Sequence, residues 1–79
     1  MTIQYDKVAD AVYMKMTDTK VAKTMEVNDT LLIDMDASGK TVGIEILDAS
    51  SQEELVKTLE NNVRMGFPIQ ISENTPAGT

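Results

Sequence analysis

A chain of 79 residues, 42% of them hydrophobic, is long enough for one domain with one small core. It contains no cysteine and no histidine, which excludes disulfide bonds, thiolate chemistry, and Ser–His or Cys–His catalysis within a single chain. The net charge of −6 disfavours direct binding to nucleic acid, whose phosphates attract Lys and Arg, and to membrane surfaces.

The first two thirds of the chain alternate between apolar and polar residues. In the second such stretch, Val12 and Met14 point to one side and Tyr13 and Lys15 to the other, a period of two that indicates a strand. Lys23 interrupts the apolar side of the next stretch and indicates a strand end or a sheet edge. We expect strands at 3–5, 11–17, 21–27, 31–36 and 42–47.

Two registers are open for the hairpin that joins the last two of these strands. A four-residue loop pairs Ile33 with Ile44 and Met35 with Val42, which gathers the apolar residues on one face. A three-residue loop suits Gly39 better, because glycine takes a positive φ at no steric cost, but it mixes the faces. We favour the four-residue loop, since a one-residue slip would move the whole apolar set into water.

After Ala49 the apolar period changes to that of a helix. Ser50 and Glu53 have the spacing of a capping box, and Gly66 suits a C-terminal cap. We therefore expect a helix over 51–65, with Ser50 as its N-cap.

These elements predict an α+β fold: a small antiparallel meander of four to five strands, with one C-terminal helix packed on one face. The domain spans 1–71, and 72–79 form a mobile tail. One helix leaves sheet edges and apolar surface uncovered, so we expect a homodimer. Whether 67–71 form a strand is left open, and the expected pairing arm consists of Phe67, Ile69 and Ile71.

The spacing of Asp34, Asp36, Gly39 and Glu45 is close to that of an EF-hand calcium loop, with Ser38 in place of a stronger ligand. Both flanks alternate as strands, whereas an EF-hand needs helices, so an Asp- and Gly-rich hairpin is the favoured interpretation. Loose binding of Mg²⁺ or Mn²⁺ by Asp34, Asp36 and Glu45 is the remaining metal hypothesis. No cofactor is expected.

Acidic residues are concentrated in the middle of the chain. Residues 26–54 contain eight acids and one base, whereas the rest of the chain contains five acids and six bases. A surface of this sign attracts a cationic partner. The candidate interaction surface, for a basic protein, consists of Asp34, Asp36, Glu45, Asp48 and Tyr13.

A set of short motifs covers roughly residues 3–51: Tyr5-Asp6, Ala9-Asp10-Ala11-Val12-Tyr13, Asp34-Met35-Asp36 with Gly39, and Gly43-Ile44-Glu45-Ile46-Leu47-Asp48-Ala49-Ser50. Together they resemble the small prokaryotic family called domain of unknown function 2283, and the last run is the most specific. The resemblance implies a small β-rich bacterial domain. It implies no catalytic residue, because the family has no established activity. Some relatives lie beside small toxin-like genes, which suggests an antitoxin role for those members.

We therefore expect a cytoplasmic, non-enzymatic protein-interaction domain, in its most specific form an antitoxin-like inhibitor of a basic, RNA-cleaving partner. The alternative is a domain that binds a divalent metal or a small ligand weakly through Asp34, Asp36 and Glu45.

Overall fold

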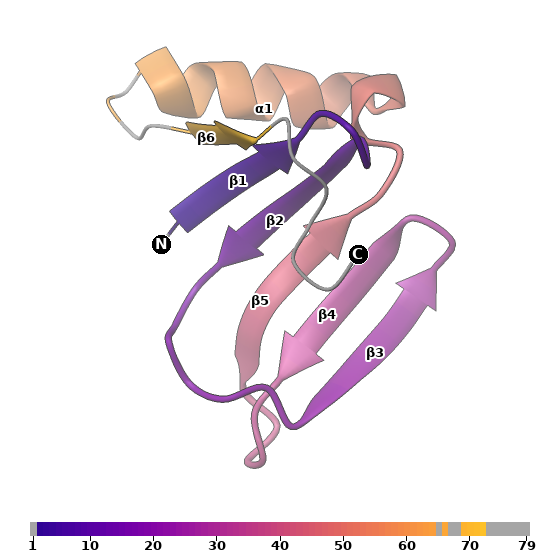
Figure 1. Ribbon diagram of the computed structural model, residues 1–79, viewed down its shortest axis with the longest axis vertical. Helices are drawn as coiled ribbons and strands as arrows, with labels where there is room; N and C mark the ends of the chain where they lie inside the picture. The colour runs from indigo at the N-terminus through magenta and orange to yellow at the C-terminus, as the bar shows by residue number, and fades with distance from the viewer. Residues whose placement is uncertain (1, 65, 67–68, 73–79) are drawn as a thin grey trace.

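The computed structural model describes residues 2–64, 66 and 69–72. Within them, six strands form one sheet in the order β3-β4-β5-β2-β1-β6, with a short 3₁₀ helix and one α-helix at its β1 end (Figure 1). The elements in chain order are β1 (Thr2–Asp6), β2 (Ala11–Lys15), β3 (Lys23–Asn28), β4 (Leu31–Met35), β5 (Thr41–Ile46), η1 (Ala49–Ser51), α1 (Glu53–Arg64) and β6 (Ile69–Ser72).

The α+β class is confirmed: β1 to β5 pair antiparallel with one another, and one helix follows them. The meander is corrected, because β2 pairs with β5 rather than with β3. The connection after β2 runs in a wide arc past the ends of β5 and β4 before β3 begins (Figure 1). This order puts the apolar residues of β5 next to those of β2, and it leaves the more polar β3 at an edge. Lys23, the first residue of β3, marks that edge as predicted.

One face of the sheet carries the core, and we call it the core face. A single cross-strand row on it joins Ile3, Met14, Ile44, Ile33 and Met25. Along this row the exposed fraction rises from 2% at Ile3 to 44% at Met25. The helix therefore packs on one face, as predicted, but it covers only the β1–β2 end of that face.

The centre of the core lies where β1 and β2 meet the segment after β5. Ile3, Val12 and Ala49 are buried together, and Leu55 from the first turn of α1 packs against them. Val12 has no exposed surface. Burying such a branched aliphatic side chain stabilises the fold by roughly 1.5–3 kcal/mol, so this junction fixes the position of the helix on the sheet.

The β4–β5 hairpin combines the two registers that the sequence left open. Ile33 pairs with Ile44 as the favoured register requires, but Met35 pairs with Thr41 and not with Val42. Val42 is an extra residue in β5, and it is almost completely buried, with 2% of its surface exposed. A bulge absorbs one residue without turning the rest of a strand over, so the apolar face survives.

The turn of this hairpin is the three-residue loop, the shorter of the two that the sequence left open. The Asp36 N–H donates to the Lys40 carbonyl at 2.9 Å, and the Gly39 N–H donates to the Asp36 carbonyl at 3.0 Å. Three residues remain between Asp36 and Lys40, and Gly39 has φ +88°. The turn thus takes the geometry that glycine favours, and the bulge at Val42 restores the register behind it.

The start of the helix differs from the prediction. Residues Ala49–Ser51 form η1, and α1 begins at Glu53, where the Gln52 carbonyl accepts the Val56 N–H at 3.0 Å. Ser50 is not the N-cap, because its hydroxyl donates to Asp10 instead. The capping-box prediction is therefore wrong. Gly66 has φ +94°, as a C-terminal cap requires, whereas Met65, the predicted last residue, lies outside the described residues.

The last strand has a partner in its own chain. β6 pairs with β1 in parallel, with Ile69 opposite Ile3 and Ile71 opposite Tyr5. The described residues of the expected pairing arm, Ile69 and Ile71, therefore pair with β1 of their own chain and not with a second subunit. Phe67 and residues 73–79 of the expected tail lie outside the described residues, and the homodimer itself stays a prediction.

Among the described helices, none is long and apolar enough to cross a membrane.

Candidate functional site

The face of the sheet opposite the core face carries the candidate site. Since α1 packs against the core face through Leu55, no helix of the described part of the chain lies on this second face. Strand alternation places side chains from four adjacent strands there. We call it the polar face, and its central residues are Tyr13, Thr24, Glu26, Leu32, Asp34 and Glu45.

Tyr13 lies across a glycine of the neighbouring strand. A Cβ atom built on Gly43 would come within 3.1 Å of Cε1 of Tyr13, and closer still to Cζ and the phenol oxygen. No other residue type leaves room for the ring in this position. Gly43 is buried, and its conformation is an ordinary extended one, so the glycine serves here as space for the tyrosine.

A hydrogen-bonded network holds the ring in that position. The Tyr13 hydroxyl donates to Oδ2 of Asp34 at 2.9 Å, and the Thr24 hydroxyl donates to Oδ1 of the same carboxylate at 2.6 Å. These residues come from β2, β4 and β3, and with Gly43 from β5 the arrangement spans four strands. Bonds to an ionised acceptor are among the stronger ones in proteins, so the polar face is ordered at its centre.

The same surroundings change the acidity of the phenol. Burial, the hydrogen bond to Asp34 and the negative charges of Asp34 and Glu45 raise the pKa of Tyr13 to about 12. At neutral pH the hydroxyl is therefore protonated and acts as a hydrogen-bond donor, not as a base. What the arrangement offers is a fixed aromatic ring beside carboxylates, which suits recognition of a cation.

Glu45 completes this arrangement. It stands directly opposite Tyr13 in the β2–β5 pairing and directly opposite Leu32 in the β4–β5 pairing. Side chains in such opposed positions are about 5 Å apart at Cβ. Glu45 is therefore a cross-strand neighbour of Tyr13 and Leu32, and its charge contributes to the raised pKa of Tyr13. Glu26, opposite Leu32 on the other side, adds a second carboxylate at the edge.

Two of the sequence-predicted surface residues lie elsewhere. Asp36 sits in the β4–β5 turn, where Oδ1 accepts the N–H groups of Ser38 and Lys40 at 2.9 and 3.0 Å and the Ser38 hydroxyl at 2.6 Å. The Ser38 hydroxyl is the main reason that the pKa of Asp36 is lowered. Asp48 has φ +53° and accepts a bond from the Ser51 hydroxyl at 3.2 Å. Both residues build turns.

The structure thus brings Tyr13, Asp34 and Glu45 together and leaves Asp36 and Asp48 outside. Within the described residues, no group of three or more acidic side chains is placed to hold a metal ion. Both oxygens of Asp34 already accept hydrogen bonds from Tyr13 and Thr24. The described structure therefore does not gather Asp34, Asp36 and Glu45 into one cluster, and weak metal binding by these residues stays a prediction.

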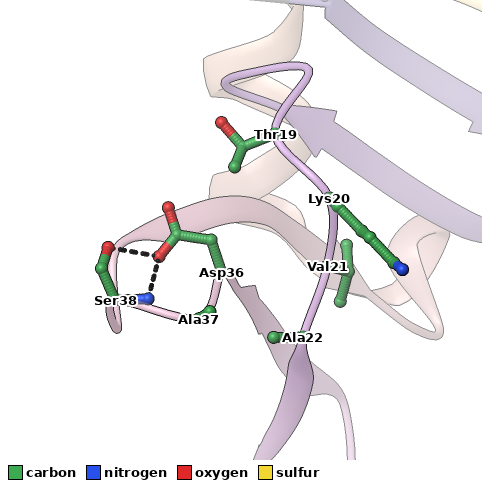
Figure 2. A pocket seen from close by; sticks show the side chains of 7 residues that line it. All are labelled: Thr19, Lys20, Val21, Ala22, Asp36, Ala37 and Ser38. Carbon is green, nitrogen blue, oxygen red and sulfur yellow. Dashed lines mark hydrogen bonds between the residues drawn. The ribbon is translucent and has the colours of Figure 1, made fainter.

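A shallow groove of ≈ 650 Å³ lies between the β2–β3 connection and the β4–β5 turn, lined by residues 19–22 and 36–38. Figure 2 shows the Asp36 carboxylate bonded to Ser38 of its own turn, with the side chain of Lys20 pointing away from it. Because the carboxylate is used by the turn, this groove presents no converging polar groups to a ligand.

Sequence reasoning missed a second polar network, at the other end of the sheet. Asp10 accepts hydrogen bonds from the Tyr5 hydroxyl at 2.8 Å, from the Ser50 hydroxyl at 2.8 Å and from the Ser50 N–H at 3.0 Å. Its carbonyl accepts the Ala49 N–H at 2.9 Å. We call Tyr5, Asp10 and Ser50 the Asp10 clamp. It ties the β1–β2 turn to η1.

Acidity and backbone geometry both reflect this clamp. The bonds from Ser50 and Tyr5 lower the pKa of Asp10, and the same bond to Asp10 raises the pKa of Tyr5. Asp10 has φ +51°, a left-handed conformation that Asp tolerates better than most residues. All three clamp residues fall within the short motifs of the sequence, which was the available signal.

The model of the family described as a protein of unknown function (DUF2283) matches residues 2–50, more than half of the chain. The chain belongs to the DUF2283 family. The matched segment ends at Ser50, so it contains β1 to β5, the whole polar face and the whole Asp10 clamp. α1 and β6 lie beyond it. A search of the curated proteins and a search of the solved structures found no match.

Proposed function

We propose that this DUF2283 domain is a non-enzymatic protein-interaction domain that binds a basic protein through its polar face. The observation that carries the proposal is the position of Tyr13. The ring lies over Gly43 and is fixed by its bond to Asp34, on a face that no described helix covers. An aromatic side chain that is already ordered loses little conformational entropy on binding, which favours its use as a contact residue.

The charge of the face determines the chemistry of the partner. Glu45 stands opposite Tyr13 on the neighbouring strand, and Glu26 lies two strands further out, on β3. An arginine of the partner can stack on the ring while its guanidinium pairs with Glu45, so that cation–π and ionic attraction act on one group. The excess of acids in residues 26–54 adds a longer-range attraction that speeds association with a basic protein.

In its most specific form, the proposal is an antitoxin-like inhibitor. The domain would place its polar face over the cationic substrate groove of an RNA-cleaving enzyme, a role suggested by the small toxin-like genes beside some members of the family. An inhibitor of this kind needs shape and charge but no catalytic group.

The interaction is tested with a short arginine-rich peptide as the probe, added to the isotopically labelled full chain and followed by amide chemical shifts. We expect the largest shifts at Tyr13, Leu32 and Glu45. Tyr13→Leu and Glu45→Gln should each weaken binding about tenfold, which corresponds to about 1.4 kcal/mol.

Glu54→Gln is the matched control, because it removes the same charge from an exposed position of α1, away from the polar face. It should change the affinity less than twofold, an effect below about 0.4 kcal/mol. Equal losses for Glu45→Gln and Glu54→Gln would mean that only net charge matters, and they would overturn the proposal.

A further inference from the structure

The edge strand β3 is the most exposed element of the sheet. Every residue of β3 is exposed, including the apolar Met25 and Val27 at 44% and 47%. β3 pairs with β4 on one side only, because it is the first strand in the sheet order. Within the part of the chain that the structure describes, no strand pairs with its other side, and an open edge of this kind can pair with another strand.

Basic residues lie at one end of this edge and acidic residues at the other. Lys20 precedes the strand and Lys23 begins it, whereas Glu26 lies toward its end and Asp29 lies in the turn that follows. Residues 20–29 are therefore neutral in total, although the whole chain carries −6. Within the described residues, none of these four side chains forms an ion pair or a hydrogen bond, so all four charges are available to a partner.

We infer that the β3 edge is the interface for a second copy of this chain, in which two β3 strands pair antiparallel about a two-fold axis. A two-fold axis perpendicular to the sheet turns the basic start of one strand toward the acidic end of the other. With this axis, the core face of one copy continues into the core face of the other, and the polar face into the polar face. The inference does not rest on the proposed function, since it uses the strand edge of β3; Thr24 and Glu26 are the residues that it shares with the polar face.

The charges also select the register. Pairing centred on Met25 joins the two Met25 side chains and places Thr24 opposite Glu26 of the second copy, while Lys23 lies near the end of the second β3, where the turn with Asp29 begins. Pairing centred on Glu26 would oppose two carboxylates directly, which is unfavourable. Pairing centred on Thr24 would set the two Lys23 side chains diagonal to each other. The register at Met25 is therefore the favoured one.

A second copy also suits the apolar surface at this edge. Met25 is the exposed end of the core-face row that begins with the buried Ile3. In the dimer, this row continues into the same row of the second copy, so Met25 becomes an internal residue. A basic protein fits the edge less well, because Lys20 and Lys23 would face like charge.

A charge-swap experiment tests the inference by sedimentation equilibrium of the full chain. The unaltered chain should reach twice its mass of 8.7 kDa within the range of about 1 μM to 1 mM that covers moderate to weak affinities. One variant carries Lys20→Glu with Lys23→Glu, and the other carries Glu26→Lys with Asp29→Lys. Each should be monomeric alone, and the two should form a heterodimer when mixed.

The matched control exchanges charges on α1, with Lys57→Glu in one chain and Glu60→Lys in another, at exposed positions away from β3. Both control chains should dimerise like the unaltered chain. Amide hydrogen exchange of the dimer should show added protection in β3. A monomer at all concentrations, or a dimer that survives both charge-swap variants unchanged, would overturn the inference. In the first case Lys20 and Lys23 would act as charges that prevent edge pairing.

Discussion

The two ends of the sheet use the same alternating pattern but bury it to very different degrees. At the β1–β2 end, Ile3 and Val12 have exposed fractions of 2% and 0%; at the β3 end, Met25 and Val27 have 44% and 47%. The difference comes from η1 and α1, which contribute Ala49 and Leu55 to the first end only. Alternation therefore marks a face as apolar, and a second layer decides whether that face becomes core.

The largest expected effect comes from the covered end. Ile3→Ala should lower the free energy of unfolding by about 2–5 kcal/mol, because it leaves a cavity beside Val12 and Ala49. Met25→Ala, in the same cross-strand row, should change it by no more than about 0.5 kcal/mol. Urea unfolding at a concentration where the chain is monomeric measures both. Similar losses would show that the two ends are equally packed.

The next effect concerns the polar face. Gly43→Ala should cost about 1–3 kcal/mol, since the new methyl group takes the space of the Tyr13 ring. Combining it with Tyr13→Ala should give a loss smaller than the sum of the two single losses, because the two residues share one space. Additive losses would mean that the ring does not depend on the glycine.

Gly39→Ala is the reference for that variant. Gly39 has φ +88° and no heavy atom within 4 Å of a Cβ built on it, so alanine there should cost about 1–2 kcal/mol through the backbone alone. Tyr13→Ala should leave this cost unchanged. Comparing the two glycine variants separates a steric requirement from a conformational one.

A smaller effect is expected at the Asp10 clamp, which holds the covered end together. Ser50→Ala should lower stability by about 0.5–1.5 kcal/mol, the net contribution of an ordinary hydrogen bond, because this bond is exposed. Its combination with Asp10→Ala should be non-additive, whereas a helix-capping role would make the two losses independent. Urea midpoints of the two single variants and the double variant decide between these results.

The clamp also predicts that the stability of the chain depends on pH in the acidic range. The pKa of Asp10 is lowered in the folded chain, mainly by the Ser50 hydroxyl, so this stabilisation is present above the unfolded pKa of 3.8 and is lost as the pH falls through the folded value. The difference between the unaltered chain and Ser50→Ala should therefore shrink below about pH 4. A constant difference down to pH 2 or so would contradict an ionised Asp10 as the acceptor.

The smallest effect at neutral pH is that of Tyr13→Phe, about 1 kcal/mol or less, because Asp34 keeps its bond from Thr24. The effect of pH is more distinctive. Folding raises the pKa of Tyr13 from 10.0 to about 12, so its contribution is complete below pH 10 and is lost as the pH rises toward 12. Tyrosinate absorbance of the Tyr5→Phe variant should show this late titration; a midpoint near the ordinary value would show that Tyr13 is not held against Asp34.

Much of the local structure follows from local signals. Alternation located the five N-terminal strands, since a period of two is a property of each strand alone. The paired faces of β4 and β5 follow from Ile33 and Ile44 in the same way. Lys23 indicated an edge, and β3 begins there and lies at the edge of the sheet. Of the candidate site, Tyr13, Asp34 and Glu45 share one face of the sheet, as alternation predicts, and their role in binding stays a prediction.

Other features depend on contacts between distant parts of the chain. Ser50 has the local spacing of an N-cap, but its hydroxyl bonds Asp10, 40 residues away. The place of β2 beside β5 could not be read from either strand, because each has an apolar side that would pair with several neighbours. Asp36 has the alternation of a strand residue, yet the three-residue turn takes it out of the sheet.

By itself, the sequence determined the class of the fold, the five N-terminal strands, the excess of acidic residues and the lack of cysteine and histidine chemistry, because these are set by composition and by periodicity over a few residues. Only the tertiary structure decided the strand order, the bulge at Val42, the Asp10 clamp and the position of the Tyr13 ring over Gly43. Each of these requires two segments to meet, and the choice among partners depends on which arrangement buries the apolar residues and satisfies the polar groups of the whole chain together.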